Sequence, residues 1–335
     1  MNTSIAAVIM LALGTMACCT TARADTHYVN VNNPSPSAPY TSWATAAQQI
    51  QQAINAAVAG DTVLVTNGVY ATGARVTPGY ACSNRVVILT NMMVRSVNGP
   101  GVTIIQGQGP LGAGAIRCVY MRAGALVGFT LTNGFTITSG SARTDVAGGG
   151  LNACNNIGIA VSNCLITSNG CVWDGAGAHS GTYYNCDFVN NVVGDGPGPI
   201  APSIGGGACN AVLVNCRLTG NGGEADGGGA AGGVLSNCMV TGNDTQGGTA
   251  GGIAYATAYN TFVGNNGGWG VRAGKLFNCT ITGNAAGGAR DSALLNCIAY
   301  YNGPSAVVLS NHYNSALTNC CTTPMPAGTG NITNE

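Results

Sequence analysis

Charge is what this sequence of 335 residues has least of. Asp, Glu, Lys and Arg together make up 7% of the chain, against about a quarter in an ordinary soluble domain. Eleven basic residues balance eleven acidic ones, so there is no basic excess to bind nucleic acid or an anionic membrane surface. Apolar residues make up 46%, which argues against disorder. We therefore expect a folded chain that does not bind nucleic acid.

Long apolar runs are also scarce. The run from Ile5 to Ala17 is too short to cross a bilayer. It is followed by Ala22-Arg23-Ala24, a small-x-small pattern typical of a signal-peptide cleavage site. We predict a signal peptide over residues 1–24, no integral membrane span, and a secreted or cell-surface protein.

Glycine and asparagine are abundant and recur in a fixed frame. The pair Asn-Cys occurs at 163–164, 185–186, 215–216, 237–238, 278–279, 296–297 and 319–320, and Asn260-Thr261 fills the gap in this series. A second Asn follows five residues after the Cys or Thr in every unit but the last. In six units a Gly lies nine residues before the Cys or Thr. Three fixed positions in one frame identify a structural repeat.

The repeat predicts a stack of short strands and tight bends. Most units have 18 to 23 residues and one has 30, and apolar side chains alternate within each unit. One unit cannot cover its own apolar face, so the units must stack strand on strand. We predict an all-β, parallel β-helix solenoid over residues 61–335 with roughly twelve coils. Both asparagines are expected at corners, where equivalent amides on successive coils can hydrogen-bond to one another.

The segment over residues 25–60 precedes the repeats and carries one helical pattern. Between Trp43 and Ala59, apolar residues recur with helical spacing, Thr41 or Ser42 can cap the start, and Gly60 can end the helix. We predict a helix here that covers the open end of the first coil.

Three segments resemble bacterial secreted β-helix proteins of the pectin-lyase-like superfamily. They are the opening HYVNVNNPSPSAPYTSWATAAQQIQQAINAAVAGDTVLVTNGVY, the repeated NCxITGN units, and the ending TNCCTTPMPAGTGNITNE, which is similar to the entry to the choice-of-anchor Q region. The resemblance implies a right-handed parallel β-helix in an extracellular setting, with no defined activity for most members. It also implies that a further capping stretch follows, so we expect the β-helix to be truncated at its C-terminal cap.

Signatures of the related pectin-degrading enzymes are absent from the sequence. There is no Asp-Asp pair and no Gly-His-Gly, and Arg272 to Lys275 lacks the Arg-x-Lys spacing. The segments GGIAY, FVNN and FVGN resemble repeats of autotransporter adhesins.

Fifteen cysteines in an exported chain suggest disulfides, but the repeat cysteines occupy one inward position. Because Thr261 replaces one of them, we predict a ladder of buried, reduced thiols that pack as small apolar side chains. Disulfides remain an alternative for the cysteines outside the frame, namely Cys82, Cys118, Cys154, Cys171, Cys209 and Cys321.

The connections between the second Asn and the next Gly vary in length and hold the candidate site. Asp174, Asp195 and Asp226 follow the second Asn by four or five residues in three consecutive units. Equal phase on a solenoid would place them on one side, where oxygen ligands suit Ca²⁺. The alternatives are ordinary Asp-Gly turns or an acid and a base for glycoside cleavage.

Further candidate ligand-binding residues lie in or beside the same connections: Trp173, Trp269, Glu224 and Asp244. Aromatic rings beside carboxylates suit the binding of sugars. We predict a non-catalytic extracellular or cell-surface protein with a structural, adhesive or glycan-binding role, whose candidate partner is an extracellular polysaccharide or a cell-surface glycan. The alternative is a polysaccharide lyase or glycoside hydrolase, for which the sequence assigns no catalytic residues. Ca²⁺ is the one candidate cofactor.

Overall fold

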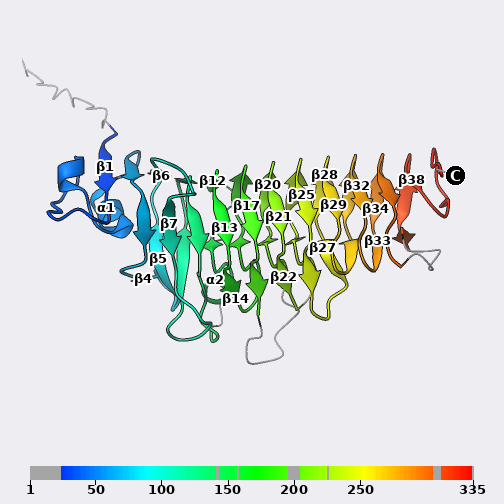
Figure 1. Cartoon of the computed structure of the whole chain (residues 1–335), viewed down its shortest axis with the longest axis horizontal. Coiled ribbons are helices and arrows are strands. Elements are labelled where there is room, and N and C mark those ends of the chain that lie inside the picture. Colours follow the sequence, from blue (N-terminus) through cyan, green and yellow to red (C-terminus); the bar gives the residue numbers. More distant parts are fainter. Residues whose placement is uncertain are drawn as a thin grey trace, which may run out of the picture.

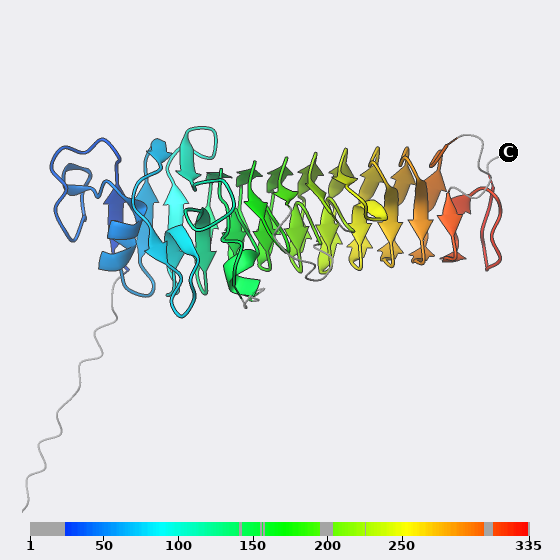
Figure 2. The same ribbon diagram turned by 90° about the horizontal axis from the view of Figure 1, so that it is seen from below.

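The chain forms an elongated stack of coils with β1 and α1 at one end and β38 at the other (Figure 1; Figure 2). The computed structural model describes residues 24–140, 143–154, 156, 158–194, 204–224, 226–304 and 311–333. Nearly all of the predicted signal peptide therefore lies outside the described residues, and it stays a prediction.

Three long sheets run along the stack and a short fourth sheet lies beside them. Sheet A consists of β1 (Thr26–Val29), β2 (Thr62–Val65), β6 (Met93–Ser96), β9 (Ala125–Val127), β12 (Ala160–Ser162), β16 (Thr182–Tyr184), β20 (Val212–Val214), β24 (Val234–Ser236), β28 (Thr257–Tyr259), β31 (Lys275–Phe277), β34 (Ala293–Leu295) and β37 (Ala316–Thr318). Sheet B consists of β3 (Gly68–Tyr70), β7 (Thr103–Gln106), β10 (Thr130–Thr132), β13 (Leu165–Thr167), β17 (Asp187–Val189), β21 (Arg217–Thr219), β25 (Met239–Thr241), β29 (Phe262–Gly264), β32 (Thr280–Thr282), β35 (Ile298–Tyr300) and β38 (Cys321–Thr322).

Sheet C carries the candidate site on its outer side. It consists of β4 (Arg75–Val76), β5 (Ser83–Ile88), β8 (Ile116–Met121), β11 (Leu151–Asn152), β15 (Ala178–His179), β19 (Ala208–Cys209), β23 (Ala230–Ala231), β27 (Ala250–Ala254), β30 (Trp269–Arg272), β33 (Gly287–Arg290) and β36 (His312–Tyr313). Sheet D consists of β14 (Gly170–Cys171), β18 (Val192–Val193), β22 (Gly222–Gly223) and β26 (Asp244–Thr245). Among the strands of the described chain, only β4 and β5 pair antiparallel. The fold is the right-handed parallel β-helix that the repeat and the resemblance predicted.

The two asparagines of the repeat have different roles at the bends. The Asn before each Cys or Thr adopts a left-handed backbone, with φ of 52° at Asn163 and 53° at Asn237, a conformation that Asn tolerates better than most residues. At the second bend the left-handed residue is the one before the second Asn, as at Asn190, Gly220 and Asn265. The prediction that both asparagines form the corners is therefore right for the first and one residue off for the second.

The second asparagines form a buried ladder of amides along the axis. From Asn169 to Asn302, each side-chain Nδ2 donates to Oδ1 of the next Asn in the ladder, at 2.9 Å from Asn221 to Asn243 and 3.0 Å from Asn243 to Asn266. The ladder contains Asn169, Asn191, Asn221, Asn243, Asn266, Asn284, Asn302 and Asn311. The first asparagines form a second ladder that is exposed and has longer contacts, such as 3.3 Å from Asn237 to Asn215. The predicted hydrogen bonding between stacked amides is confirmed.

The repeat cysteines form a buried column inside the coils. Each of them is at most 4% exposed, and Thr261 occupies the same column with 1% exposure. None of the 13 described cysteines is in a disulfide. The predicted ladder of packed thiols is confirmed, and the described cysteines outside the frame are free as well.

The N-terminal segment differs from the single helix that the spacing predicted. Ser42 caps a short 3-10 helix, η1 (Trp43–Thr45), and a separate helix α1 spans Ile50–Ala56. Ala47, between them, pairs with Val29 at the edge of sheet A, so the chain is extended where the prediction had a helix. The helix α1 contacts β1, β2 and β5, and its role as a cap stays a prediction. Because β1 already pairs with β2, the stack begins before residue 61.

The connections that follow the asparagine ladder emerge on one side of the stack, where α2 (Arg143–Val146), β14 and β22 lie in Figure 1. They are long in the first half of the stack, but only three residues separate Asn266 from Gly270. The connections therefore cover less of the outer face of sheet C beside β30 and β33 than beside β15 and β19.

Candidate functional site

One outward-facing position recurs along sheet C. Its inward neighbours, such as Ala208 and Val271, belong to the core, and side chains alternate across a strand. The paired residues at the outward position are, in order along the stack, Tyr120, Asn152, His179, Cys209, Ala231, Ala254, Arg272, Arg290 and Tyr313. We call this row the outer column.

The outer column changes character along the stack. From Tyr120 to Ala254 its side chains are buried under the connections. The side chains of Arg272 and Arg290 are 34% and 40% exposed, and Tyr313 is 48% exposed. The column therefore has a closed half and an open half, and each half holds a cluster of polar side chains.

The closed half contains Asp174, His179 and Cys209, all of them buried. One ligand-type atom from each lies within 4.8 Å of the other two. The Nε2 atom of His179 has no hydrogen-bond partner in the described part of the chain, and its Nδ1 lies 3.4 Å from Ser180 Oγ. Arg143 Nη1 lies 2.7 Å from Asp174 Oδ2, without the alignment of a hydrogen bond.

Burial determines the protonation states of this cluster. It lowers the pKa of His179 to about 4, with smaller contributions from Arg143 and Arg117. Burial also raises the pKa of Asp174, although Arg143 opposes this. The pKa of the Cys209 thiol is raised by burial and by Asp174. The imidazole and the thiol are therefore both neutral at pH 7.

The open half begins with a cluster of Asp226, Tyr255 and Arg272. Asp226 Oδ1 accepts hydrogen bonds from the backbone N–H groups of Thr249 at 2.6 Å and Ala250 at 2.9 Å. Its Oδ2 accepts from Tyr255 Oη at 3.1 Å and from the guanidinium of Arg272. The guanidinium also lies over the Tyr255 ring, 5.7 Å from its centroid, within the range of a cation–π contact.

The pKa of Asp226 is lowered and the pKa of Tyr255 is raised in this cluster. Burial raises the pKa of Asp226, but the backbone hydrogen bonds, Arg272 and Tyr255 lower it further, so the net shift is downward. Burial and the hydrogen bond to Asp226 raise the pKa of Tyr255. At neutral pH Asp226 is thus an anion and Tyr255 keeps its proton.

The open half continues with one arginine–aromatic contact and one contact between two aromatic rings. Arg290 lies over the ring of Tyr313, 5.6 Å from its centroid. Trp269 packs against the same tyrosine with a centroid distance of 6.4 Å. Arg272 and Arg290 are direct partners in the β30–β33 pair. We call Tyr255, Arg272, Arg290, Tyr313 and Trp269 the arginine–aromatic strip.

The structure does not bring Asp174 and Asp226 together. Backbone hydrogen bonds run from Gly175 to Ile204 and from Gly205 to Asp226, so the coil between Asp174 and Asp226 places Ile204 at the equivalent position. The two carboxylates are about 10 Å apart along the axis, at two strand spacings, and each faces an arginine. Asp195 lies outside the described residues. The described residues give no calcium site shared by Asp174 and Asp226, and the calcium prediction that includes Asp195 stays a prediction.

The other predicted ligand-binding residues are scattered. Trp173 is half-buried against a small apolar cluster that contains Val146 and Val172. Glu224 is exposed. Asp244 is exposed too, and its Oδ1 accepts from the backbone N–H of Thr245 at 2.7 Å. Only Trp269 of this group lies on the arginine–aromatic strip.

Sequence reasoning missed most of the residues in both clusters. His179, Cys209, Arg272 and Arg290 all stand two residues after the repeat Gly. This position can be located in the repeat, but its residue type differs from coil to coil, so it shows no conserved residue within the repeat. Its importance follows only from the alternation across sheet C.

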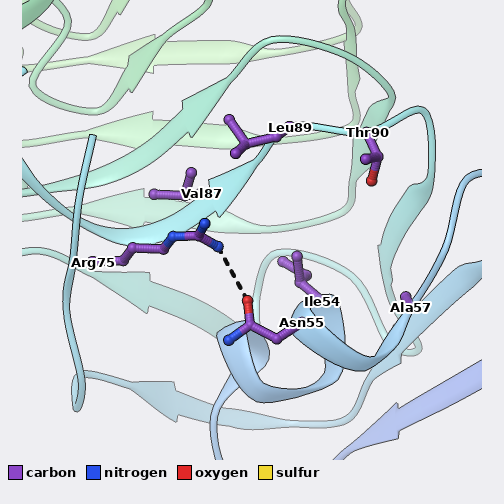
Figure 3. Close-up of a pocket in the computed structure, with 7 residues that line it drawn as sticks. All are labelled: Ile54, Asn55, Ala57, Arg75, Val87, Leu89 and Thr90. Atoms are coloured by element: carbon purple, nitrogen blue, oxygen red, sulfur yellow. Dashed lines mark hydrogen bonds between the residues drawn. The ribbon is translucent and has the colours of Figure 1, made fainter. Parts of the chain in front are cut away.

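A separate open pocket of about 440 Å³ lies between α1 and β5 (Figure 3). Arg75 Nη1 donates to Asn55 Oδ1 there at 3.1 Å. The lining residues are Ile54, Asn55, Ala57, Arg75, Val87, Leu89 and Thr90. One cation among neutral side chains offers no acid–base pair, and none of the predicted site residues lines the pocket.

Among the described residues no helix is both long and apolar enough to cross a bilayer. No protein-family model and no curated protein matches the chain.

Several solved structures are similar to the chain at low identity. A pectate lyase is 15% identical over 92% of this chain and 77% of its own, with a TM-score of 0.39. An alginate lyase from Paenibacillus sp. is 12% identical over 80% of this chain and 95% of its own, with a TM-score of 0.40. The A-module of a mannuronan C-5 epimerase from Azotobacter vinelandii is 16% identical over 85% and 86%, with a TM-score of 0.38. Similarity at this level carries no information about activity, which has to come from the side chains of this chain.

Proposed function

We propose that this protein is an extracellular or cell-surface protein that binds a polysaccharide along the open half of sheet C without cleaving it. The observation that carries the proposal is the arginine–aromatic strip. It exposes aromatic rings and two guanidinium groups, and the guanidinium groups lie beside the short connections that follow Asn266 and Asn284.

The spacing of the strip suits a linear polymer. Successive coils repeat at about 4.8 Å along the axis, which is close to the length of one sugar residue. A chain that runs along the axis would meet one coil per sugar. The ring of Tyr313 could stack on an apolar sugar face, and Arg290 could donate hydrogen bonds to hydroxyl or carboxylate oxygens.

The chemistry of the strip favours binding over cleavage. A general acid or base works best when its pKa lies near the working pH. The pKa of Asp226 is lowered and that of Tyr255 is raised, so both shifts lead away from neutrality. Asp226 is also engaged by Arg272 and two backbone N–H groups.

The second candidate function is a polysaccharide lyase or glycoside hydrolase. It is favoured by the proximity of a carboxylate, a phenol and a guanidinium in the cluster of Asp226, Tyr255 and Arg272. A cleaving enzyme would require Asp226 to exchange the arginine for substrate.

The test is a binding and cleavage assay with a panel of acidic and neutral polysaccharides. We expect retardation in affinity electrophoresis with at least one polymer, and no release of reducing or unsaturated ends. Tyr313→Ala and Arg290→Ala should each weaken binding about tenfold, which corresponds to about 1.4 kcal/mol. Tyr259→Ala is the matched control, because this tyrosine is also exposed but lies on sheet A.

Two results would contradict the proposal. Release of ends that disappears in Asp226→Ala would show that the protein is an enzyme. Binding that Tyr259→Ala weakens as much as Tyr313→Ala would show that the strip is not the binding surface.

A further inference from the structure

The closed half of the outer column holds a donor set that the polysaccharide proposal does not use. Asp174, His179 and Cys209 offer an oxygen, a nitrogen and a sulfur within 4.8 Å of one another. They are 2%, 2% and 0% exposed. Asp174 comes from the connection after β14, and the other two come from adjacent strands, β15 and β19.

The partners of these side chains leave ligand atoms free. Among the described residues, His179 Nε2 is buried without a hydrogen-bond partner, and Asp174 Oδ2 has none with hydrogen-bond geometry. A buried polar atom without a partner is destabilising and calls for an explanation. The nearby Ser180 Oγ, 3.4 Å from His179 Nδ1, can accept a hydrogen bond from Nδ1–H, and that tautomer leaves the Nε2 lone pair available to a metal, as outer-shell partners of metal-binding histidines do.

We propose that Asp174, His179 and Cys209 bind one Zn²⁺ ion. Zinc takes carboxylate oxygen, imidazole nitrogen and thiolate sulfur together, at about 2.0–2.3 Å. Such bonds place neighbouring ligand atoms about 3.4–3.8 Å apart in a tetrahedron, so the cluster needs to contract by about 1 Å. Three protein ligands leave one coordination position for water.

The donor set excludes the common alternatives. Ca²⁺ and Mg²⁺ are held by oxygen ligands, whereas this cluster contains one carboxylate beside sulfur and nitrogen. A nucleophilic Cys-His-Asp arrangement would need access for a substrate, and these side chains are at most 2% exposed. Because these side chains are buried, the ion would be kept from substrates and would tie the connection after β14 to two coils of sheet C.

Arg143 supplies the positive charge that faces Asp174 in the metal-free protein. Its guanidinium lies 2.7 Å from Asp174 Oδ2, and its side chain is 49% exposed while that of Asp174 is 3% exposed. An arginine with half of its side chain in water can turn outward when zinc takes the carboxylate. Removing this competing cation should tighten zinc binding.

The first experiment uses the full chain, reduced and freed of metal with a chelator, and then titrated with Zn²⁺ against a chromophoric competitor. We expect one tightly bound equivalent per chain. With Co²⁺ in place of Zn²⁺ we expect a sulfur-to-cobalt charge-transfer band, because a thiolate ligand produces it. Wild-type protein that shows neither the equivalent nor the band overturns the proposal without reference to any variant.

The second experiment compares variants that circular dichroism shows to be folded. Cys209→Ser and His179→Gln should each lower the zinc affinity about 100-fold or more, and Cys209→Ser should lose the cobalt band. Cys238→Thr is the matched control, since this buried cysteine lies in the inner thiol column where Thr261 already occurs. Arg143→Ala should bind zinc more tightly.

Zinc should also raise the midpoint of thermal unfolding by about 4 °C at a free concentration 100-fold above Kd, in wild type and in Cys238→Thr but not in Cys209→Ser. Equal zinc affinity in Cys209→Ser and wild type would overturn the proposal, and so would an equal loss in Cys238→Thr.

Discussion

Truncation of Asn243 should be among the most destabilising single substitutions in the stack. Its side chain donates to Leu218 O at 2.9 Å and to Asn266 Oδ1 at 3.0 Å, and it accepts from both the backbone and side-chain nitrogens of Asn221 at 2.9 Å. Asn243→Ala leaves two buried donors of Asn221 without an acceptor, at about 1–3 kcal/mol each. Together with the cavity, the loss should be about 3–5 kcal/mol.

The assay is urea unfolding, with midpoint and slope compared between variants. Asn237→Gly is the matched control: this asparagine is exposed, donates one 3.3 Å hydrogen bond to Asn215, and has a φ of 53° that glycine tolerates. It should change stability by less than about 1 kcal/mol.

A third variant separates hydrogen bonding from volume. Asn243→Asp keeps the shape of the side chain but replaces the donor amide with an oxygen that faces three other oxygens, namely Leu218 O, Asn266 Oδ1 and Thr241 O. If hydrogen bonds determine the loss of stability, Asn243→Asp should lower the free energy of unfolding by at least as much as Asn243→Ala. A loss in Asn243→Ala no greater than in Asn237→Gly, or a near-neutral Asn243→Asp, would refute the reasoning.

Three further predictions concern the thiol column, the glycine frame and the N-terminal coil. Cys238→Thr should cost less than about 1.5 kcal/mol, whereas Cys238→Asp should cost about 3–5 kcal/mol because it buries an unpaired charge; equal unfolding midpoints would contradict this. Gly252→Ala should cost about 3 kcal/mol, since its Cβ would lie 2.2 Å from a backbone carbonyl oxygen, while Gly101→Ala, with nothing within 4 Å, should be near neutral. Burial raises the pKa of Asp61, but backbone hydrogen bonds and His27 lower it further; its contribution is therefore present above the ordinary carboxyl pKa and lost as pH falls through the lower folded-state value. An Asp61→Asn variant should be less stable at pH 7 and should lose less stability than wild type in acid unfolding, and parallel stability–pH curves would exclude this role.

The frame of the fold is readable from the sequence because stacking constrains the same position in every coil. The column of Cys164 through Cys320 and the ladder of second asparagines repeat because each member contacts its own equivalent above and below. Even so, the last ladder position is filled by Asn311, which lies in a connection and follows no repeat spacing. Only the three-dimensional register shows it.

Most residues of the two outer-column clusters could not be predicted from the sequence in the same way. The outer column changes from His179 and Cys209 to Arg272 and Arg290, since nothing on the outside requires equivalent residues to match. Equal distance from the ladder asparagine predicted that Asp174, Asp195 and Asp226 share one phase, but on the coil between Asp174 and Asp226 the backbone hydrogen bonds place Ile204 at the equivalent position. Counting residues fails where a loop of variable length lies between the anchor and the side chain.

The uneven connections have a consequence for how such a protein can evolve. Most of each unit belongs to sheets A and B and to the two amide ladders. A substitution there must still pack against, and hydrogen-bond to, the coils on either side. The segment after the ladder asparagine is not constrained by stacking in this way, and it can lengthen, shorten or change charge while the stack persists. A lineage could therefore open or close stretches of the outer face of sheet C one coil at a time. The length of a binding surface would then be set by how many successive units carry short connections, a quantity that can change by one without rebuilding the core.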